Sequence, residues 1–244
     1  MAGNAYIGTS GWNYQGWKDG FYQGVPKKNW LEFYARKFPA LEINATFYGL
    51  QKKSTFEKWR DCTPPGFRFA IKGNRFLTHN KKLLNPLDSI RLEQERAGGL
   101  GEKLIAILWQ LPRRMAKDAA RLEAFADALG NWSAARHAVE FRHSSWFDDE
   151  TAQILRRHRI AVCMSDAADW PRWDRVTTDL VYIRLHGHAR TYASVYGPER
   201  LREWAARVKE WRRQGYDVHV YFNNDAEGAA PVDARCLLDL INLI

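Results

Sequence analysis

Several apolar, β-rich runs of this sequence end in charged or polar side chains, at positions where apolar residues would suffice for a core. Glu42, Lys72 and Glu140 occupy such positions, and Arg184 and His186 do so further along the chain. A carboxylate can act as a general acid or base, a lysine amine as an electrophile or nucleophile, and a histidine as a proton carrier near neutral pH. We therefore expect Glu42, Lys72, Glu140 and His186 to be the catalytic residues.

A second group of residues has the chemistry to hold a ligand. Arginine binds phosphate or carboxylate oxygens in bidentate geometry, and aromatic rings offer a stacking face for a ring. Amide and carboxylate side chains can orient the polar groups of a substrate. We expect substrate contacts from Trp12, Tyr14, Asn44, Tyr48, Gln110, Arg142, Arg184, Asn223 and Asp225.

Metal-dependent hydrolysis, as in barrels that resemble apurinic endonucleases, is an alternative chemistry for the same positions. Its candidate ligands are Glu42, Glu140, His186 and Asp225. The seven histidines lack metal-site spacing apart from the pair His186 and His188, and the neighbouring lysine and arginines would repel a divalent ion. The favoured expectation is that no metal is bound.

Motifs for bound nucleotides and for esterase chemistry do not occur in the sequence. No GxGxxG follows an expected strand, and neither GxxxxGK[ST] nor GxSxG is present. We therefore expect no cofactor, and the remaining candidate ligand is a small anionic molecule.

The composition describes a basic, folded chain. The 244 residues are 45% hydrophobic and 27% charged, with a formal net charge of +9. The three cysteines lack CxxC spacing, which disfavours a disulfide framework and a cysteine zinc site. The apolar runs are shorter than a membrane span requires, and the N-terminus lacks the pattern of a secretory signal. We expect a cytoplasmic protein without membrane contact, and the oligomeric state stays open.

A nucleic-acid-binding protein is the non-enzymatic alternative. Basic pairs at 27–28 and 81–82 and basic runs at 156–159 and 212–213 can neutralise phosphates. The last two coincide with expected helix C-termini, where cations balance the helix dipole without any partner. Affinity that falls steeply with added salt would distinguish such a protein from a small-molecule enzyme.

Strand and helix patterns alternate along the whole chain. The expected strands are 6–9, 41–44, 67–72, 104–111, 137–141, 161–165, 181–186 and 217–223. The loops that precede the strands are short, whereas the loops that follow the first, third, sixth and seventh strands are long and rich in aromatic residues. This pattern predicts a single (β/α)₈ TIM-type barrel domain over 1–244, with a doubly wound open sheet as the competing fold.

The helix patterns between these strands are amphipathic. Aromatic residues recur at helical spacing over 30–38, and further helices are expected at 116–129, 149–158, 198–214 and 233–243. Ser54 and Glu57 have the spacing of a capping box, which predicts a helix start at Ser54. Gly215 is expected to end the helix at 198–214.

Seven segments, in order, resemble the YecE-like family, catalogued as domain of unknown function 72. They are IGTSGWxYxxW from Ile7, LEINxTFY from Leu41, Lys72 with Thr78 and His79, LxQLP from Leu108, AVEFRHxSW from Ala138, YIRLHG from Tyr182 and YFNND from Tyr221. The resemblance covers about residues 6–240 and implies one α/β-barrel domain, without an established reaction.

The C-terminal ends of the strands form the active face of a barrel, so the polar residues above are expected to converge there. The favoured function is a metal-independent enzyme that acts on an anionic substrate, phosphorylated or resembling a nucleotide or sugar. In the alternative, the same polar cluster is a structural network of ion pairs.

Overall fold

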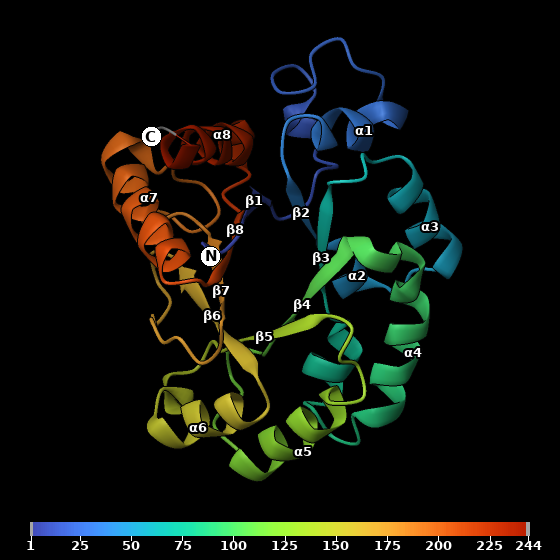
Figure 1. The fold of residues 1–244 in the computed structure, drawn as a ribbon, viewed down its shortest axis with the longest axis vertical. Helices are drawn as coiled ribbons and strands as arrows, with labels where there is room; N and C mark the ends of the chain where they lie inside the picture. Colours follow the sequence, from blue (N-terminus) through green and yellow to red (C-terminus); the bar gives the residue numbers. More distant parts are fainter. Residues whose placement is uncertain (1, 243–244) are drawn as a thin grey trace.

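Eight parallel strands alternate with helices in the computed structural model, which describes residues 2–242. They form one sheet in the order β1-β8-β7-β6-β5-β4-β3-β2, and helices surround it (Figure 1). This confirms the predicted (β/α)₈ barrel. The strands are β1 (Ala5–Thr9), β2 (Ala40–Ile43), β3 (Arg68–Lys72), β4 (Leu104–Gln110), β5 (Arg136–Glu140), β6 (Ile160–Asp166), β7 (Leu180–Leu185) and β8 (Asp217–Phe222).

The helices follow the expected order with some shifted boundaries. The α-helices are α1 (Trp30–Ala35), α2 (Ala45–Tyr48), α3 (Lys53–Asp61), α4 (Leu87–Ala97), α5 (Ala119–Leu129), α6 (Asp149–Arg157), α7 (Gly197–Arg213) and α8 (Ala229–Asn242). Within residues 2–242, no helix has the length and apolar composition needed to cross a membrane.

Three helix expectations need correction. The capping box at Ser54 is wrong, because α3 already begins at Lys53 and its start has no side-chain cap. The last helix begins at Ala229, four residues before the expected start, because buried alanines and Pro231 extend its packed face. Helix α4 was not expected, since polar residues dominate its sequence. Gly215, which follows the C-cap residue Gln214 of α7, has φ of +90°, as a C-terminal glycine requires.

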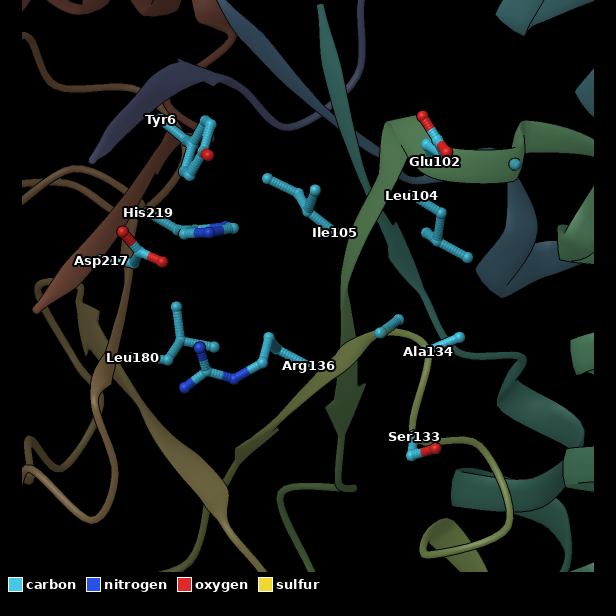
Figure 2. Close-up of a pocket in the computed structure, with 12 residues that line it drawn as sticks. Tyr6, Glu102, Leu104, Ile105, Ser133, Ala134, Arg136, Leu180, Asp217 and His219 are labelled. Carbon is cyan, nitrogen blue, oxygen red and sulfur yellow. The ribbon is translucent and has the colours of Figure 1, made fainter. Parts of the chain in front are cut away.

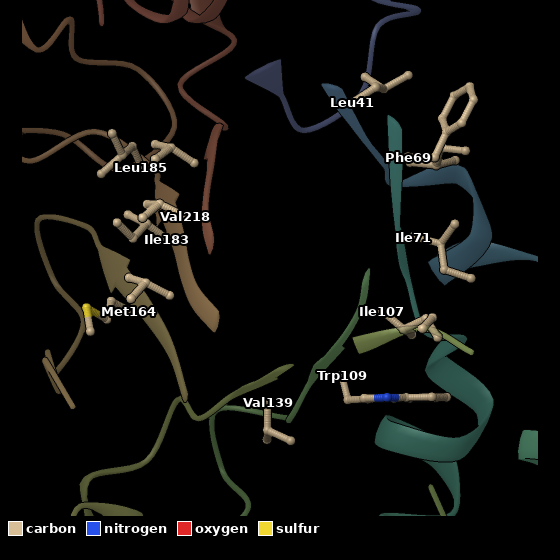
Figure 3. Packing of buried hydrophobic residues seen from close by; sticks show 14 of the residues in the cluster. Leu41, Phe69, Ile71, Ile107, Trp109, Val139, Met164, Ile183, Leu185 and Val218 are labelled. Carbon is tan, nitrogen blue, oxygen red and sulfur yellow. The ribbon is translucent and has the colours of Figure 1, made fainter. Parts of the chain in front are cut away.

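Alternating side chains divide the apolar core into two layers. Ala40, Ala70 and Ala106 belong to the inner cluster that fills the barrel, together with the rings of Tyr182 and Tyr221. The intervening residues point outward against the helices, where they form the larger cluster (Figure 3). Small side chains on several inner positions leave room for these rings, which carry polar groups into the barrel.

The two ends of the sheet, β1 and β2, approach each other closely where the barrel closes. A Cβ atom on Gly8 would lie 2.0 Å from the carbonyl oxygen of Ala40, so glycine is required there. The Tyr34 hydroxyl accepts a hydrogen bond from the Thr9 amide at 2.8 Å and donates to the Ala40 carbonyl at 3.1 Å. Tyr34 thereby links the backbones of the first two strands.

At the N-terminal end of the strands the barrel opens into a cavity of about 540 Å³. Tyr6, Arg136, Asp217 and His219 are among its lining residues, and their side chains surround the opening in Figure 2. All four lie at or near the beginning of a strand. The residues with expected chemistry lie at the opposite end.

Candidate functional site

Arg184, on β7, lies between two buried carboxylates at the C-terminal end of the barrel. Its Nη2 donates to Glu42 Oε1 at 2.8 Å, and its Nη1 donates to Glu140 Oε2 at 2.8 Å. All three side chains are almost completely buried. The structure therefore brings residues of β2, β5 and β7 into direct contact, and one guanidinium links two carboxylates that would otherwise repel each other.

The remaining acceptor positions of Glu42 are also occupied. The Ser10 hydroxyl donates to its Oε1, and the Tyr182 hydroxyl donates to its Oε2 at 2.6 Å. Arg184 Nη2 also donates to the Ser10 hydroxyl at 2.9 Å. Ser10 and Tyr182 were not among the expected site residues. Tyr182 could have been found, because it alternates with Arg184 on the inner face of one strand.

Glu140 is held as a carboxylate by two arginines. Arg142 Nε donates to its Oε1, while Arg184 binds its Oε2. Although burial raises the pKa of Glu140, the guanidinium groups of Arg142 and Arg184 outweigh that effect and hold it well below its usual range. Glu140 is therefore ionised at neutral pH and keeps two cations at the mouth.

His186 is fully buried beside this ion-pair network. Its Nδ1 lies 3.1 Å from Asn223 Nδ2, and its Nε2 lies 3.8 Å from Glu140 Oε1. Burial, followed by the positive charge of Arg184, lowers the pKa of His186 well below its ordinary value. The imidazole is therefore neutral at physiological pH.

Lys72, the last residue of β3, differs from the other cations of the site. Its Nζ lies 3.9 Å from the centre of the Phe47 ring, and within residues 2–242 it forms no ion pair with a carboxylate. Burial, followed by the charge of Arg184, lowers the pKa of Lys72 to about 7. A large fraction of its amine is consequently unprotonated at neutral pH.

Tyr14, Asn44 and Asp225 form a polar group next to Ser10. The Tyr14 hydroxyl donates to the Ser10 carbonyl at 2.7 Å, and Asn44 Nδ2 donates to the same oxygen at 3.2 Å. Burial raises the pKa of Asp225 to about 7. The buried Oδ1 atoms of Asn44 and Asp225 accept no hydrogen bond from the described part of the chain. They are two acceptors that a donor group on a ligand could satisfy.

Three of the expected substrate contacts lie outside this network. Trp12 packs edge-on against Trp59 of α3, with ring centres 5.4 Å apart. Tyr48 is 70% exposed at the end of α2. The Gln110 amide donates to the adjacent Leu111 carbonyl at 3.3 Å. These side chains make no hydrogen bond with the buried cluster in the part of the chain that the structure describes.

An aromatic cover lies over the site. The Arg142 guanidinium stacks on the Trp170 ring at 3.3 Å, and Trp170 also contacts His186 edge-on with ring centres 4.4 Å apart. Tyr192 packs against both His186 and Trp170. Its backbone has φ of +66°, which is strained for a tyrosine. The long loops after β6 and β7 supply these rings, and Trp170 covers Arg142 and His186.

The carboxylates at the mouth are poorly suited to bind a metal ion. Both oxygens of Glu42 and of Glu140 accept hydrogen bonds from protein groups, and cationic Arg184 lies between them. Among residues 2–242, three possible ligands approach one another instead at Glu123, Asp127 and His158, on the outer helices. Glu123 already accepts hydrogen bonds there from an arginine and from His158.

Comparisons with known proteins agree with the resemblance seen in the sequence. The chain is 26% identical to the UPF0759 protein YunF of Bacillus subtilis, over 98% of this chain and 95% of that protein. It is 30% identical to the UPF0759 protein YecE of Escherichia coli, over 62% of this chain and 54% of that protein.

A solved structure matches the whole barrel. The crystal structure of a DUF72 family protein from Thermotoga maritima superposes with a TM-score of 0.86 at 28% identity, covering 98% of this chain and 99% of the other. The model of the family described as protein of unknown function DUF72 matches residues 6–243. The chain therefore belongs to the DUF72 family.

Proposed function

We propose that this protein is an enzyme that acts on a small anionic substrate at the C-terminal mouth of the barrel, with Lys72 as its reacting amine. The proposal rests on the burial, the pairing and the pKa of the Lys72 amine. Its amine is buried beside two arginines, lacks a paired carboxylate among the described residues, and has a pKa of about 7. A lysine in such surroundings is activated as a nucleophile or a base.

The surrounding charges suit an anion. Each arginine carries one positive charge, and the carboxylates of Glu42 and Glu140 balance Arg142 and Arg184. The pKa of Lys72, about 7, allows two forms at neutral pH: the protonated form gives the cluster an excess positive charge that a phosphate or carboxylate group can neutralise, and the unprotonated form is the one that reacts. Because Trp170 covers Arg142 and His186, substrate entry is coupled to movement of this ring. Closure of Trp170 behind the substrate would exclude water from the reaction.

The reaction that best uses an unprotonated lysine is addition to a carbonyl group. The amine nitrogen attacks the carbonyl carbon, and loss of water from the resulting carbinolamine forms an imine. Both hydrogens of the amine leave with the carbonyl oxygen as this water, so the step balances without another reactant. In this scheme Glu42 and Glu140 position Arg184 and Arg142 and do not themselves transfer protons.

A trapping experiment tests this proposal. The protein is incubated with a panel of phosphorylated and carboxylated aldehydes and ketones, with and without a chelator, and then treated with sodium borohydride. Hydride reduction of an imine leaves a stable secondary amine, which peptide mass spectrometry can locate. We expect one adduct, at Lys72, that is insensitive to the chelator and absent in Lys72→Met. Adducts spread over surface lysines, or equal labelling of Lys72→Met, would overturn the proposal.

A further inference from the structure

A second pocket, of about 390 Å³, lies between α4 and the segment that follows β3. Leu50, Phe76, Leu77 and Leu92 form its apolar walls. Phe76 is 57% exposed and Leu92 is 42% exposed, so the rim presents unusually large apolar side chains to solvent. Exposed apolar surface around a concave site is typical of a ligand-binding pocket.

Glu93, on α4, is a buried carboxyl group that lines this apolar pocket. The side chain is only 3% exposed. Its Oε1 accepts a hydrogen bond from the Asn74 amide at 2.9 Å, while its Oε2 accepts none from the described residues. No lysine, arginine or histidine in that part of the chain forms an ion pair with it. A buried carboxyl group without a cation is costly, and a bound ligand could supply the missing partner.

The other charged groups of the pocket do not pair with Glu93, so a cationic ligand can. Lys81 also lines the pocket, but its Nζ donates to the Asn85 carbonyl at 2.6 Å. Asp88 adds a second carboxylate at the exposed edge. The lining thus contains two carboxyl groups and one ammonium group, on a chain whose net charge is +9. Ionised Glu93 would leave the lining with one negative charge in excess, which the ammonium group of a ligand can neutralise.

The backbone beside the pocket is also strained. Phe76–Asn80 form a π-helical turn, which is rare and often accompanies functional sites. Lys82, Leu83 and Asn85 follow with φ of +50°, +67° and +43°, in the left-handed region. Such strain persists only where the surrounding structure over-determines it, and it clusters at binding sites.

We propose that this pocket binds a small primary amine with an apolar body, and that the ammonium group of the ligand pairs with Glu93. The aromatic or aliphatic body would lie against Phe76 and the three leucines. This site is separate from the chemistry proposed for Lys72, and either can fail without the other.

Proton release provides a specific signature of this binding mode. Burial raises the pKa of Glu93 to about 8, and no charged neighbour contributes to the shift, so the carboxyl group is largely protonated at neutral pH. Pairing with an ammonium ion requires the carboxylate, so binding releases a proton. Affinity for the amine should therefore rise roughly tenfold per pH unit below about pH 8 and then level off.

Calorimetric titrations with three probes of similar shape test the proposal. The probes are phenethylamine, phenethyl alcohol and hydrocinnamate, which are cationic, neutral and anionic. We expect phenethylamine to bind at least tenfold more tightly than the other two, with release of a proton detected by comparing buffers of different ionisation enthalpy. Absence of amine binding, or equal affinity for the alcohol, would overturn the proposal.

Variants locate the interaction. Glu93→Gln keeps an acceptor for the Asn74 amide and should abolish the preference for the amine and the proton release. Glu95→Gln, at an exposed position of the same helix, is the matched control and should retain both. Should Glu93→Gln fail to fold, Phe76→Ala removes an exposed wall and should weaken amine and alcohol alike. A preference that survives in Glu93→Gln, or unchanged binding in Phe76→Ala, would show that the probes bind elsewhere.

Discussion

Replacement of Lys72 by methionine should make the protein more stable, and by an amount that depends on pH. In the folded chain the pKa of Lys72 is about 7, compared with an ordinary value of 10.5. Each pKa unit corresponds to about 1.4 kcal/mol, so the protonated side chain costs the fold about 5 kcal/mol relative to the unfolded chain. Methionine has a similar length and no charge to bury.

The pH dependence separates this cost from changes in packing. Between about pH 7 and pH 10.5 the unfolded chain binds more protons at Lys72 than the folded chain, so stability rises with pH. Below pH 7 both states are protonated and the cost is constant. Linkage over this window predicts that the stability advantage of Lys72→Met shrinks by about 3 kcal/mol between pH 6 and pH 9.

Urea denaturation of both proteins at a series of pH values measures this difference. Lys103→Met is a matched control, because Lys103 donates to the Arg60 and Thr63 carbonyls, both at 2.6 Å, and its loss should destabilise the fold. A stability difference for Lys72→Met that does not change with pH would refute the reasoning, since it would mean that burial does not lower the pKa of this amine.

Three further substitutions test the ion pairs of Arg184, the closure of the barrel between β1 and β2, and the covering of the site by Trp170. Arg184→Leu leaves two buried carboxylates without their shared partner and should cost about 3–5 kcal/mol of unfolding free energy in urea titrations; a loss below about 1 kcal/mol would contradict the network. Tyr34→Phe removes the hydroxyl that joins β1 to β2 and should cost about 1–3 kcal/mol, whereas an unchanged denaturation midpoint would deny that role. Trp170→Ala should expose His186, so that diethyl pyrocarbonate modifies this histidine faster in peptide mass spectra; equal rates would show that Trp170 does not limit access.

Local patterns predicted eight strands alternating with helices, but they left a doubly wound open sheet as the alternative to the barrel. Short β-rich apolar runs marked all eight strands within about two residues of their observed ends, because such a run is a property of residues that are neighbours in the chain. The positions at which helices begin were harder to predict. The serine of the apparent capping box at Ser54 lies inside α3, and the mostly polar α4 gave too weak an apolar pattern to be recognised.

The candidate site was predictable as a set of residue types but not as an arrangement. Polar side chains at strand ends converge once the barrel closes, so Glu42, Glu140 and Arg184 could be grouped from the sequence. Tyr182 could have been added to this group, but the pairing of individual atoms could not be predicted, because each contact joins strands that are far apart in the chain. The same holds for Lys72, whose lowered pKa depends on burial and on Arg184, contributed by a strand more than a hundred residues away.

The sequence by itself determined the alternation of strands and helices, the placement of charged residues at strand ends and the excess of positive charge. The tertiary structure alone decided which carboxylates bind which arginines, that Lys72 is buried without a carboxylate partner among residues 2–242, and which aromatic ring covers the site. The reason is physical. Strand and helix patterns depend on residues that are neighbours in the chain, whereas charge pairing and burial depend on distances that exist only after the chain has folded.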